Sequence, residues 1–222
     1  MAQVKVCSLS KIIKKVTVLD NIDFTFEGGL IYGLRGINGS GKTMLMRCIT
    51  GLIYPTSGEI YIDDKKLGKD VSFPPSIGAL IENPKFLKEY TGFENLKMLA
   101  DIQGKISSEE IRETLKSVGL SPDDKRTFYK YSLGMRQRLG IAAAILGKPE
   151  IILLDEPTNA IDADGLKGIR KVIRNLISPD RVIIVACHEK QEMDMLADVI
   201  IEMEDGKITG VEENEAFKNA EI

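Results

Sequence analysis

Cysteine is scarce in this chain of 222 residues, which has three, at positions 7, 48 and 187. The number is odd and no C-x-x-C spacing occurs, so the sequence suggests neither a disulfide framework nor a zinc site. We therefore interpret Cys7, Cys48 and Cys187 as small buried apolar residues.

Long hydrophobic runs are also absent. The longest, 141–146 and 182–187, have the length of core elements, whereas a membrane helix needs about 18 apolar residues. Any membrane role must therefore come from a partner. Residues 1–6 lack a cleavable signal pattern. The formal net charge of −3 shows no excess of the positive charge that is typical of nucleic-acid-binding proteins. We expect a cytoplasmic protein that does not bind nucleic acid.

Short alternating strands open the chain. Apolar residues recur at every second position in parts of 1–29, a pattern typical of half-buried strands. Turn signals at 28–29 and 55–58 separate this region from a buried strand at 30–34 and a further strand at 59–62.

The middle of the chain, from about 77 to 147, reads as helical. Capping boxes at Thr91 and Ser107 begin two helices, and Ser132 is a suitable N-cap for a helix over 132–147 that ends at Gly147. A helical block between two parts of a nucleotide-binding unit predicts a separate lobe, suited to sensing or docking.

Buried strands return in the last third, at 151–154 and 182–186. Their alternation with amphipathic helices predicts a parallel sheet covered on both faces. The segment 199–208 turns at Asp205-Gly206, a strong hairpin signal. We expect the acidic tail from Glu212 to be loosely held.

The segment from Gly36 to Thr43 fits the phosphate-binding pattern G-x-x-x-x-G-K-[ST] and lies between the strand at 30–34 and a predicted helix at 44–50. Its glycines allow consecutive N–H groups to face phosphate oxygens, and the helix N-terminus favours the same anion. Lys42 can reach the β- and γ-phosphates, and the Thr43 hydroxyl suits magnesium. The predicted nucleotide-binding residues here are Gly36, Asn38, Gly39, Ser40, Gly41, Lys42 and Thr43.

The apolar strand at 151–154 ends in Asp155-Glu156, at the edge where open α/β sheets bind ligands. Asp155 can hold magnesium through water, and Glu156 can face a water placed for attack on the γ-phosphate. Alone, the two carboxylates could be exposed turn residues before Pro157. Paired with the phosphate loop, they indicate ATP hydrolysis.

Residues 131–139 resemble the signature segment of ATP-binding cassette (ABC) ATPases, written L-S-G-G-Q or L-S-G-G-M-R-Q-R. Asn159-Ala160-Ile161-Asp162 resembles the D-loop of that family, and His188 stands where the family has its switch histidine. The same resemblance makes Asp155 the Walker B aspartate and Glu156 the catalytic glutamate. The motifs occur in family order and spacing over nearly the whole chain.

The resemblance implies a single α/β domain with the P-loop NTPase fold of ABC ATPases. Such a fold has a mostly parallel core sheet flanked by helices, an antiparallel β part on the N-terminal side and an inserted helical lobe. The core would take about 1–76 and 148–222, and the lobe about 77–147. Lys42, Glu156 and His188 would be catalytic, with ATP and Mg²⁺ as cofactors.

The resemblance also implies a nucleotide-dependent homodimer or pseudo-dimer closed head to tail. Ser132 caps a helix whose first N–H groups form an anion site, and Ser132, Gly134 and Asp162 would contact the ATP of the other subunit.

Three positions depart from the family pattern. Ile12-Ile13 replace the aromatic residue that stacks on adenine, so Ile13 would make a plain apolar contact with the base. Glu82 replaces the Q-loop glutamine, as in bacitracin-resistance and lantibiotic-immunity exporters, and would join Thr43 and Asp155 around magnesium. Leu133 replaces the first signature glycine.

The sequence thus predicts the ATP-hydrolysing subunit of an ABC transporter, most similar to exporters of antimicrobial peptides or hydrophobic compounds. A separate transmembrane permease would dock on the helical lobe and the Glu82 loop, which places the protein on the inner face of the cell membrane. The alternatives are a soluble ABC ATPase with cytosolic partners and a nucleotide-gated regulator, and an intact Glu156 argues against the regulator.

Overall fold

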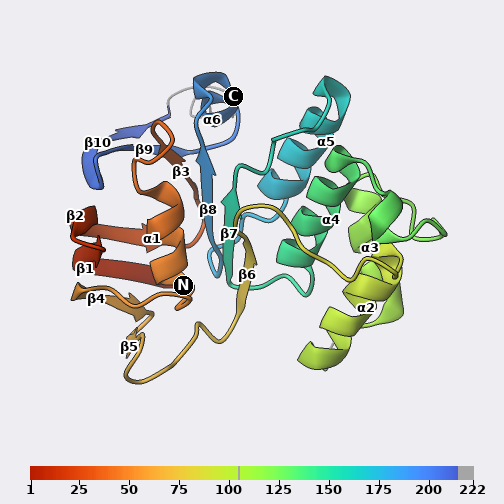
Figure 1. Cartoon of the computed structure of the whole chain (residues 1–222), viewed down its shortest axis with the longest axis horizontal. Coiled ribbons are helices and arrows are strands. Elements are labelled where there is room, and N and C mark those ends of the chain that lie inside the picture. Colours follow the sequence, from red (N-terminus) through yellow and green to blue (C-terminus); the bar gives the residue numbers. More distant parts are fainter. Residues whose placement is uncertain (105, 215–222) are drawn as a thin grey trace.

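The computed structural model describes residues 1–104 and 106–214 and contains two β-sheets. The smaller sheet is antiparallel, with strand order β2-β1-β4-β5 (Figure 1). Its strands are β1 (Gln3–Ile13), β2 (Val16–Glu27), β4 (Ser57–Ile62) and β5 (Lys65–Lys66). The antiparallel part predicted for the N-terminal side is therefore present.

The larger sheet has the strand order β10-β9-β3-β8-β7-β6. Its neighbours pair in parallel except for the antiparallel hairpin of β9 and β10, which turns at Asp205-Gly206 as predicted. The strands are β3 (Ile31–Arg35), β6 (Ile77–Leu80), β7 (Ile151–Asp155), β8 (Val182–Cys187), β9 (Val199–Glu204) and β10 (Lys207–Glu213).

Helices cover both faces of the larger sheet, and α1 lies between the two sheets (Figure 1). The helices are α1 (Lys42–Ile49), α2 (Gly92–Gln103), α3 (Ser108–Ser117), the short 3₁₀ helix η1 (Phe128–Lys130), α4 (Leu133–Ile145), α5 (Ala163–Arg174) and α6 (Lys190–Asp194). None of the described helices is long and apolar enough for a membrane span.

Side-chain alternation along the central strands divides the core in two. In β7, Ile151 and Leu153 pack with α1 and the small sheet, whereas Ile152 and Leu154 pack with the helices of the opposite face. All five residues of β7 and all six of β8 are buried. This explains why both strands are continuous apolar runs, and it confirms a mostly parallel sheet covered on both faces.

The predicted helical region begins later than residue 77, because 77–80 form β6 at the edge of the core sheet. β6 pairs in parallel with β7, and α4 packs across both strands. Gly78 explains the close approach, since a Cβ there would lie 1.7 Å from the carbonyl oxygen of Ala144 in α4. A strand of four residues containing glycine carries too little periodicity to be read from sequence.

The helix starts follow the sequence signals with two exceptions: Ser107 forms only one bond of its predicted capping box, and Asp162 forms no capping bond. Both bonds of the capping box at Thr91 form, and Ser107 and Ser132 accept from the N–H groups three residues later. Asp162 occupies the N-cap position of α5, but its carboxylate accepts a hydrogen bond from Arg138 (2.9 Å) in place of a capping bond.

The prediction of a loose tail from Glu212 is wrong for Glu212 and Glu213, which belong to β10 and pair with Ile200 and Val199. The Arg35 guanidinium donates to the Glu212 carboxylate across 2.9 Å, and this ion pair fixes the end of β10. The rest of the predicted tail, 215–222, lies outside the described residues.

The three cysteines are free thiols. Cys48 and Cys187 are buried as predicted, and Cys7 is half-buried.

Candidate functional site

The phosphate-binding loop leaves β3 at Arg35 and enters α1 at Lys42. Gly39 and Gly41 have φ values of +87° and +107°, which side-chain-bearing residues rarely adopt. At Gly36 a Cβ would lie 2.2 Å from the carbonyl oxygen of Met203, so only glycine fits. These positions therefore require glycine, which is typical of a loop that turns consecutive N–H groups toward a phosphate.

Lys42 is folded back onto this loop. Its side chain is 5% exposed, and Nζ donates hydrogen bonds to the carbonyl oxygens of Gly36 (2.7 Å) and Ile37 (3.0 Å). The ammonium group is thus held where a phosphate oxygen can exchange with the two carbonyls.

Asp155 closes β7 directly opposite the start of α1. The Thr43 hydroxyl donates to Asp155 Oδ2 across 2.7 Å, so the two predicted magnesium ligands are in contact. Burial raises the pKa of Asp155, a shift that the hydrogen bond from Thr43 opposes and the charge of Glu156 increases. A buried carboxylate next to a hydroxyl suits Mg²⁺, which prefers oxygen ligands.

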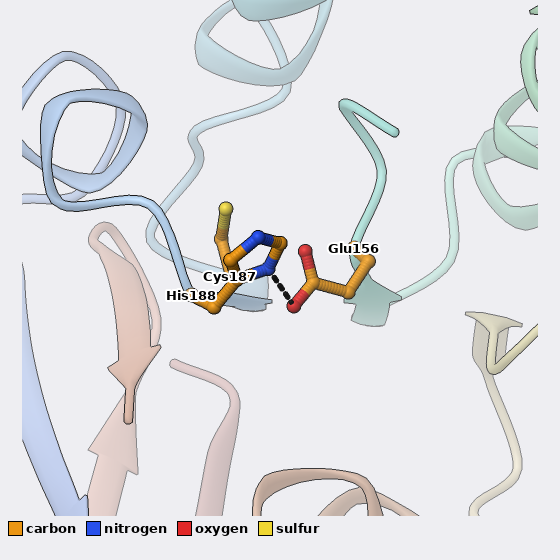
Figure 2. A group of neighbouring side chains, drawn as sticks. All are labelled: Glu156, Cys187 and His188. Carbon is orange, nitrogen blue, oxygen red and sulfur yellow. Dashed lines mark hydrogen bonds and ion pairs between the residues drawn. The ribbon is translucent and has the colours of Figure 1, made fainter. Parts of the chain in front are cut away.

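Glu156 and His188 meet at the carboxyl ends of β7 and β8. The N–H of Glu156 donates to the carbonyl oxygen of Ala186 (2.8 Å), which extends the pairing of the two strands by one residue. His188 Nδ1 lies 2.9 Å from Glu156 Oε1 (Figure 2). Glu156 has φ +49°, a conformation that costs a non-glycine residue energy and often marks a functional site.

Gln137 of α4, which sequence reasoning missed, holds this carboxylate segment. It is 7% exposed, and its Nε2 donates to the backbone carbonyl of Glu156 across 2.8 Å. The bond links the signature helix to Glu156. Gln137 lies within the quoted signature segment, so its place there was the available signal.

Most of these groups line one cavity of about 670 Å³, whereas His188 is not part of its lining and contacts the lining residue Glu156. The size suits a nucleotide. Its lining comprises Val18, Asn38, Gly39, Gly41, Lys42, Thr43, Met44, Glu82, Asn83, Gln137, Asp155, Glu156 and Asn159. Of the predicted loop residues, Gly36 and Ser40 do not line it, since Gly36 packs against Met203 and Ser40 is 2% exposed.

Glu82 lines the cavity, but its carboxylate is already paired. Oε1 accepts from Arg47 Nη2 across 2.5 Å, and Glu82 has a left-handed backbone with φ +61°. Arg47 lies one helical turn after Thr43 on the same face of α1, so Thr43 contacts Asp155 and Arg47 contacts Glu82. Arg47 is absent from the residues predicted for the site, although its i, i+4 spacing from Thr43 places both on one face of α1.

The remaining predicted residues lie outside the lining of the cavity. Ile13 ends β1, next to the turn to β2, and is 37% exposed, while Val18 of β2 reaches the cavity. Ser132, Gly134 and Asp162 are instead grouped at the start of α4 and α5. A Cβ on Gly134 would lie 2.7 Å from the carbonyl oxygen of Ala160, so the signature helix begins against the predicted D-loop.

We expect Asp155→Asn to stabilise the nucleotide-free protein by on the order of 1 kcal/mol, or about 2–4 °C in Tm, because it removes a buried charge and keeps an acceptor for Thr43. The pKa of Asp155 is higher in the folded than in the unfolded state. The loss of stability caused by its ionisation is therefore absent below the ordinary pKa of 3.8 and develops as pH rises through the raised folded-state pKa. Thermal unfolding at pH 7 measures the gain. The exposed Asp64→Asn is the control, and a lower Tm for Asp155→Asn would contradict the prediction.

Comparisons with family models and with known proteins indicate the same family. The chain matches the ABC transporter family over residues 19–159. It is 47% identical over 205 residues to the uncharacterized ABC transporter ATP-binding protein YybJ of Bacillus subtilis (strain 168), covering 92% of this chain and 94% of YybJ.

Two further relatives have names that include a substrate. The bacitracin transport ATP-binding protein BcrA of Enterococcus faecalis is 38% identical over 90% of this chain and 66% of BcrA. The lantibiotic transport ATP-binding protein SrtF of Streptococcus pyogenes is 35% identical over 98% of this chain and 93% of SrtF.

A solved dimer of the ATP-binding cassette MJ0796 with ADP and Pi superposes with a TM-score of 0.86 at 24% identity, covering 95% of this chain and 98% of that one, and confirms the predicted fold. The family match, the close relatives and the joining of phosphate loop, Asp155 and Glu156 at one cavity lead to one conclusion. The chain belongs to the ABC transporter family, as one of its ATP-hydrolysing ATP-binding subunits.

Proposed function

We propose that this subunit powers an exporter of an antimicrobial peptide or another hydrophobic compound. The observation that carries the ATPase part is the meeting of Lys42, Asp155 and Glu156 at one cavity, with His188 in contact with Glu156. The export part is supported by the relatives BcrA and SrtF, whose names give bacitracin and lantibiotic transport, and by Glu82 at the Q-loop position.

In the proposed mechanism, Lys42 exchanges its bonds to the loop carbonyls for the β- and γ-phosphates. Thr43 and Asp155 would hold Mg²⁺, which when bound would neutralise phosphate charge. Glu156 takes a proton from the attacking water, and His188 orients the Glu156 carboxylate through the 2.9 Å contact. Gln137 fixes the backbone of Glu156, so its carboxylate keeps one position during turnover.

We also propose that two subunits close head to tail around ATP. Ser132 at the start of α4 is exposed, and its neighbour Leu133 is 62% exposed. Ser132, Gly134 and Asp162 would thus meet the nucleotide of the second subunit, either a copy of this chain or a related one. The Leu133 side chain would then belong to the subunit interface.

The proposed permease contact is the segment 84–90 after Glu82, together with the helical lobe. Leu87 and Tyr90 of this segment are 51% and 42% exposed, so the segment offers apolar surface to a partner. Docking there would place the protein on the inner face of the membrane. A soluble ABC ATPase with cytosolic partners is the alternative.

Affinity purification from detergent-solubilised membranes tests the transporter role. We expect an integral membrane protein to co-purify with the chain, and Leu87→Glu with Tyr90→Glu to abolish this while ATPase activity persists. Val211→Glu, an exposed apolar position in β10, serves as the control. Recovery of the wild type only with cytosolic proteins would favour the alternative.

The proposed magnesium role of Glu82 requires that it exchange Arg47 for the cation. An exposed ion pair is worth about 0.2–1 kcal/mol, so Arg47→Gln should lower the Mg²⁺ concentration for half-maximal ATPase activity by up to about fivefold. The same substitution in a Glu82→Gln background should produce no shift. An equal shift in both backgrounds would exclude Glu82 as a ligand.

We expect ATP and GTP to bind within about tenfold of each other, because the residues proposed to contact the base, Ile13 and the cavity-lining Val18, are aliphatic. Apolar packing cannot distinguish exocyclic groups, and stacking would add at most roughly 1.5 kcal/mol. Ile13→Tyr should tighten ATP binding by no more than about tenfold and leave the maximal hydrolysis rate nearly unchanged. Ile12→Tyr is the control, since alternate side chains of a strand leave on opposite faces. A hundredfold preference of the wild type for ATP, measured by calorimetry, would contradict the assignment.

A further inference from the structure

A carboxylate, a cysteine and a histidine meet beside the cavity. Glu156 is far in sequence from Cys187 and His188, which are adjacent in the chain. The parallel pairing of β7 and β8 sets Asp155 opposite Ala186, so Glu156 leaves one strand where Cys187 ends the other. His188 follows at once. Figure 2 shows the three side chains converging from the two strand ends.

The ligand atoms of these residues are close enough to share one ion. A carboxylate oxygen of Glu156, the Cys187 sulfur and a ring nitrogen of His188 all lie within 4.8 Å of one another. Glu156 Oε1 contacts His188 Nδ1, whereas Oε2 is buried without a hydrogen-bond partner among the described residues. A buried carboxylate oxygen without a partner is costly unless a ligand satisfies it.

We propose that Glu156, Cys187 and His188 form an inhibitory site for a thiophilic divalent cation such as Zn²⁺. Thiolate, imidazole and carboxylate are the three ligand types that zinc takes in proteins, with bond lengths of about 2.0 to 2.3 Å. Tetrahedral ligands at those bond lengths lie about 3.3 to 3.8 Å apart. Rotation about the side-chain bonds closes the remaining distance, and water takes the fourth position.

The sulfur distinguishes this site from the magnesium site. Mg²⁺ prefers oxygen ligands, whereas zinc binds sulfur and nitrogen. Binding replaces the S–H bond of Cys187 by a Zn–S bond and releases the proton to water. The N–H of Glu189 points at the sulfur across 3.4 Å, which helps to stabilise the thiolate so formed.

The cation would inhibit ATP hydrolysis because it occupies Glu156 and His188, and this inference rests on the catalytic roles proposed for them above. A cation on Glu156 and His188 withdraws the base and its orienting partner from the attacking water. Cys187 itself has no part in that chemistry. Its thiol is 3% exposed, and burial raises its pKa to about 11, so it stays protonated at neutral pH in the absence of the cation.

Cobalt binding tests the site without ATP. Co²⁺ added to the nucleotide-free chain should give a thiolate-to-cobalt absorption band, because cobalt takes the same ligands as zinc and reports sulfur ligation. The band should persist in Cys7→Ser with Cys48→Ala, which leaves Cys187 as the only cysteine, and should vanish in Cys187→Ala. Absence of a band in the wild type, or a band that survives Cys187→Ala, would overturn the proposal.

Zinc titration of ATP hydrolysis at saturating Mg²⁺ tests the inhibition. Cys187→Ala should keep the basal rate and raise the half-inhibitory Zn²⁺ concentration by about tenfold or more, since one of three protein ligands is lost. Equal inhibition of the wild type and Cys187→Ala would mean that zinc acts elsewhere, and would reject the proposal. A wild type without basal hydrolysis would instead contradict the proposed function, while the cobalt result would still stand on its own.

Discussion

Glu156→Gln should lower ATP turnover at least a hundredfold and still bind ATP. A general base contributes about 10²–10⁴ in rate, and the amide cannot take the proton from water. The local structure should survive, because the bonds from Gln137 to the carbonyl and from the Glu156 N–H to Ala186 involve only the backbone of residue 156. The amide oxygen can also accept from His188.

The same variant should accumulate as an ATP-bound dimer, because in the proposed head-to-tail dimer hydrolysis would dissolve the interface. Size-exclusion chromatography with ATP and Mg²⁺ measures this directly. Glu189→Gln is the matched control, because Glu189 is 63% exposed and lies 4.0 Å from His188, so it removes the same charge nearby. A Glu156→Gln protein that stays monomeric at high concentration and hydrolyses at the parent rate would remove Glu156 from its proposed role.

The parts of the site that could be predicted from sequence are those with local physical causes. The loop from Gly36 to Thr43 is recognisable because its glycines answer steric demands that no other residue meets, as the positive φ of Gly39 and Gly41 shows. The meeting of Asp155 with the loop follows from strand order, since parallel strands carry their ends to one edge.

The parts that escaped prediction depend on tertiary contacts. β6 is held by α4 across Gly78, and nothing in 77–80 alone distinguishes a strand from a loop. The Arg47–Glu82 pair joins α1 to a loop in which Glu82 has a left-handed backbone, a conformation that its sequence does not predict. The bond from Gln137 to the carbonyl of Glu156 joins residues from two elements whose relative position the sequence does not state.

The position of Ile13 illustrates a different difficulty. Its strand pairs with β2 through several register shifts between Val6 and Ile12, so counting residues from the N-terminus cannot say which side chain reaches the cavity. Val18 of β2 lines it instead. A sequence position equivalent to the adenine-stacking residue of the family therefore does not guarantee an equivalent place in space.

Lys42→Ala should weaken ATP binding roughly tenfold to a hundredfold, because hydrogen bonds to charged groups are worth about 1.5–3 kcal/mol. In this structure Lys42 is 5% exposed and its ammonium group donates to two loop carbonyls, which phosphate oxygens of opposite charge would replace. Fluorescent-nucleotide titration measures the loss.

Two variants separate the charge of Lys42 from its packing. Lys42→Met keeps most of the side-chain volume and should lose as much affinity as Lys42→Ala, whereas the exposed Lys167→Ala changes the net charge equally and should lose none. Unchanged affinity in Lys42→Met would show that the side chain acts by packing alone. The carbonyls of Gly36 and Ile37 lose their donor in both variants, so the nucleotide-free loop should also become less stable, which faster amide hydrogen exchange over 36–42 would report.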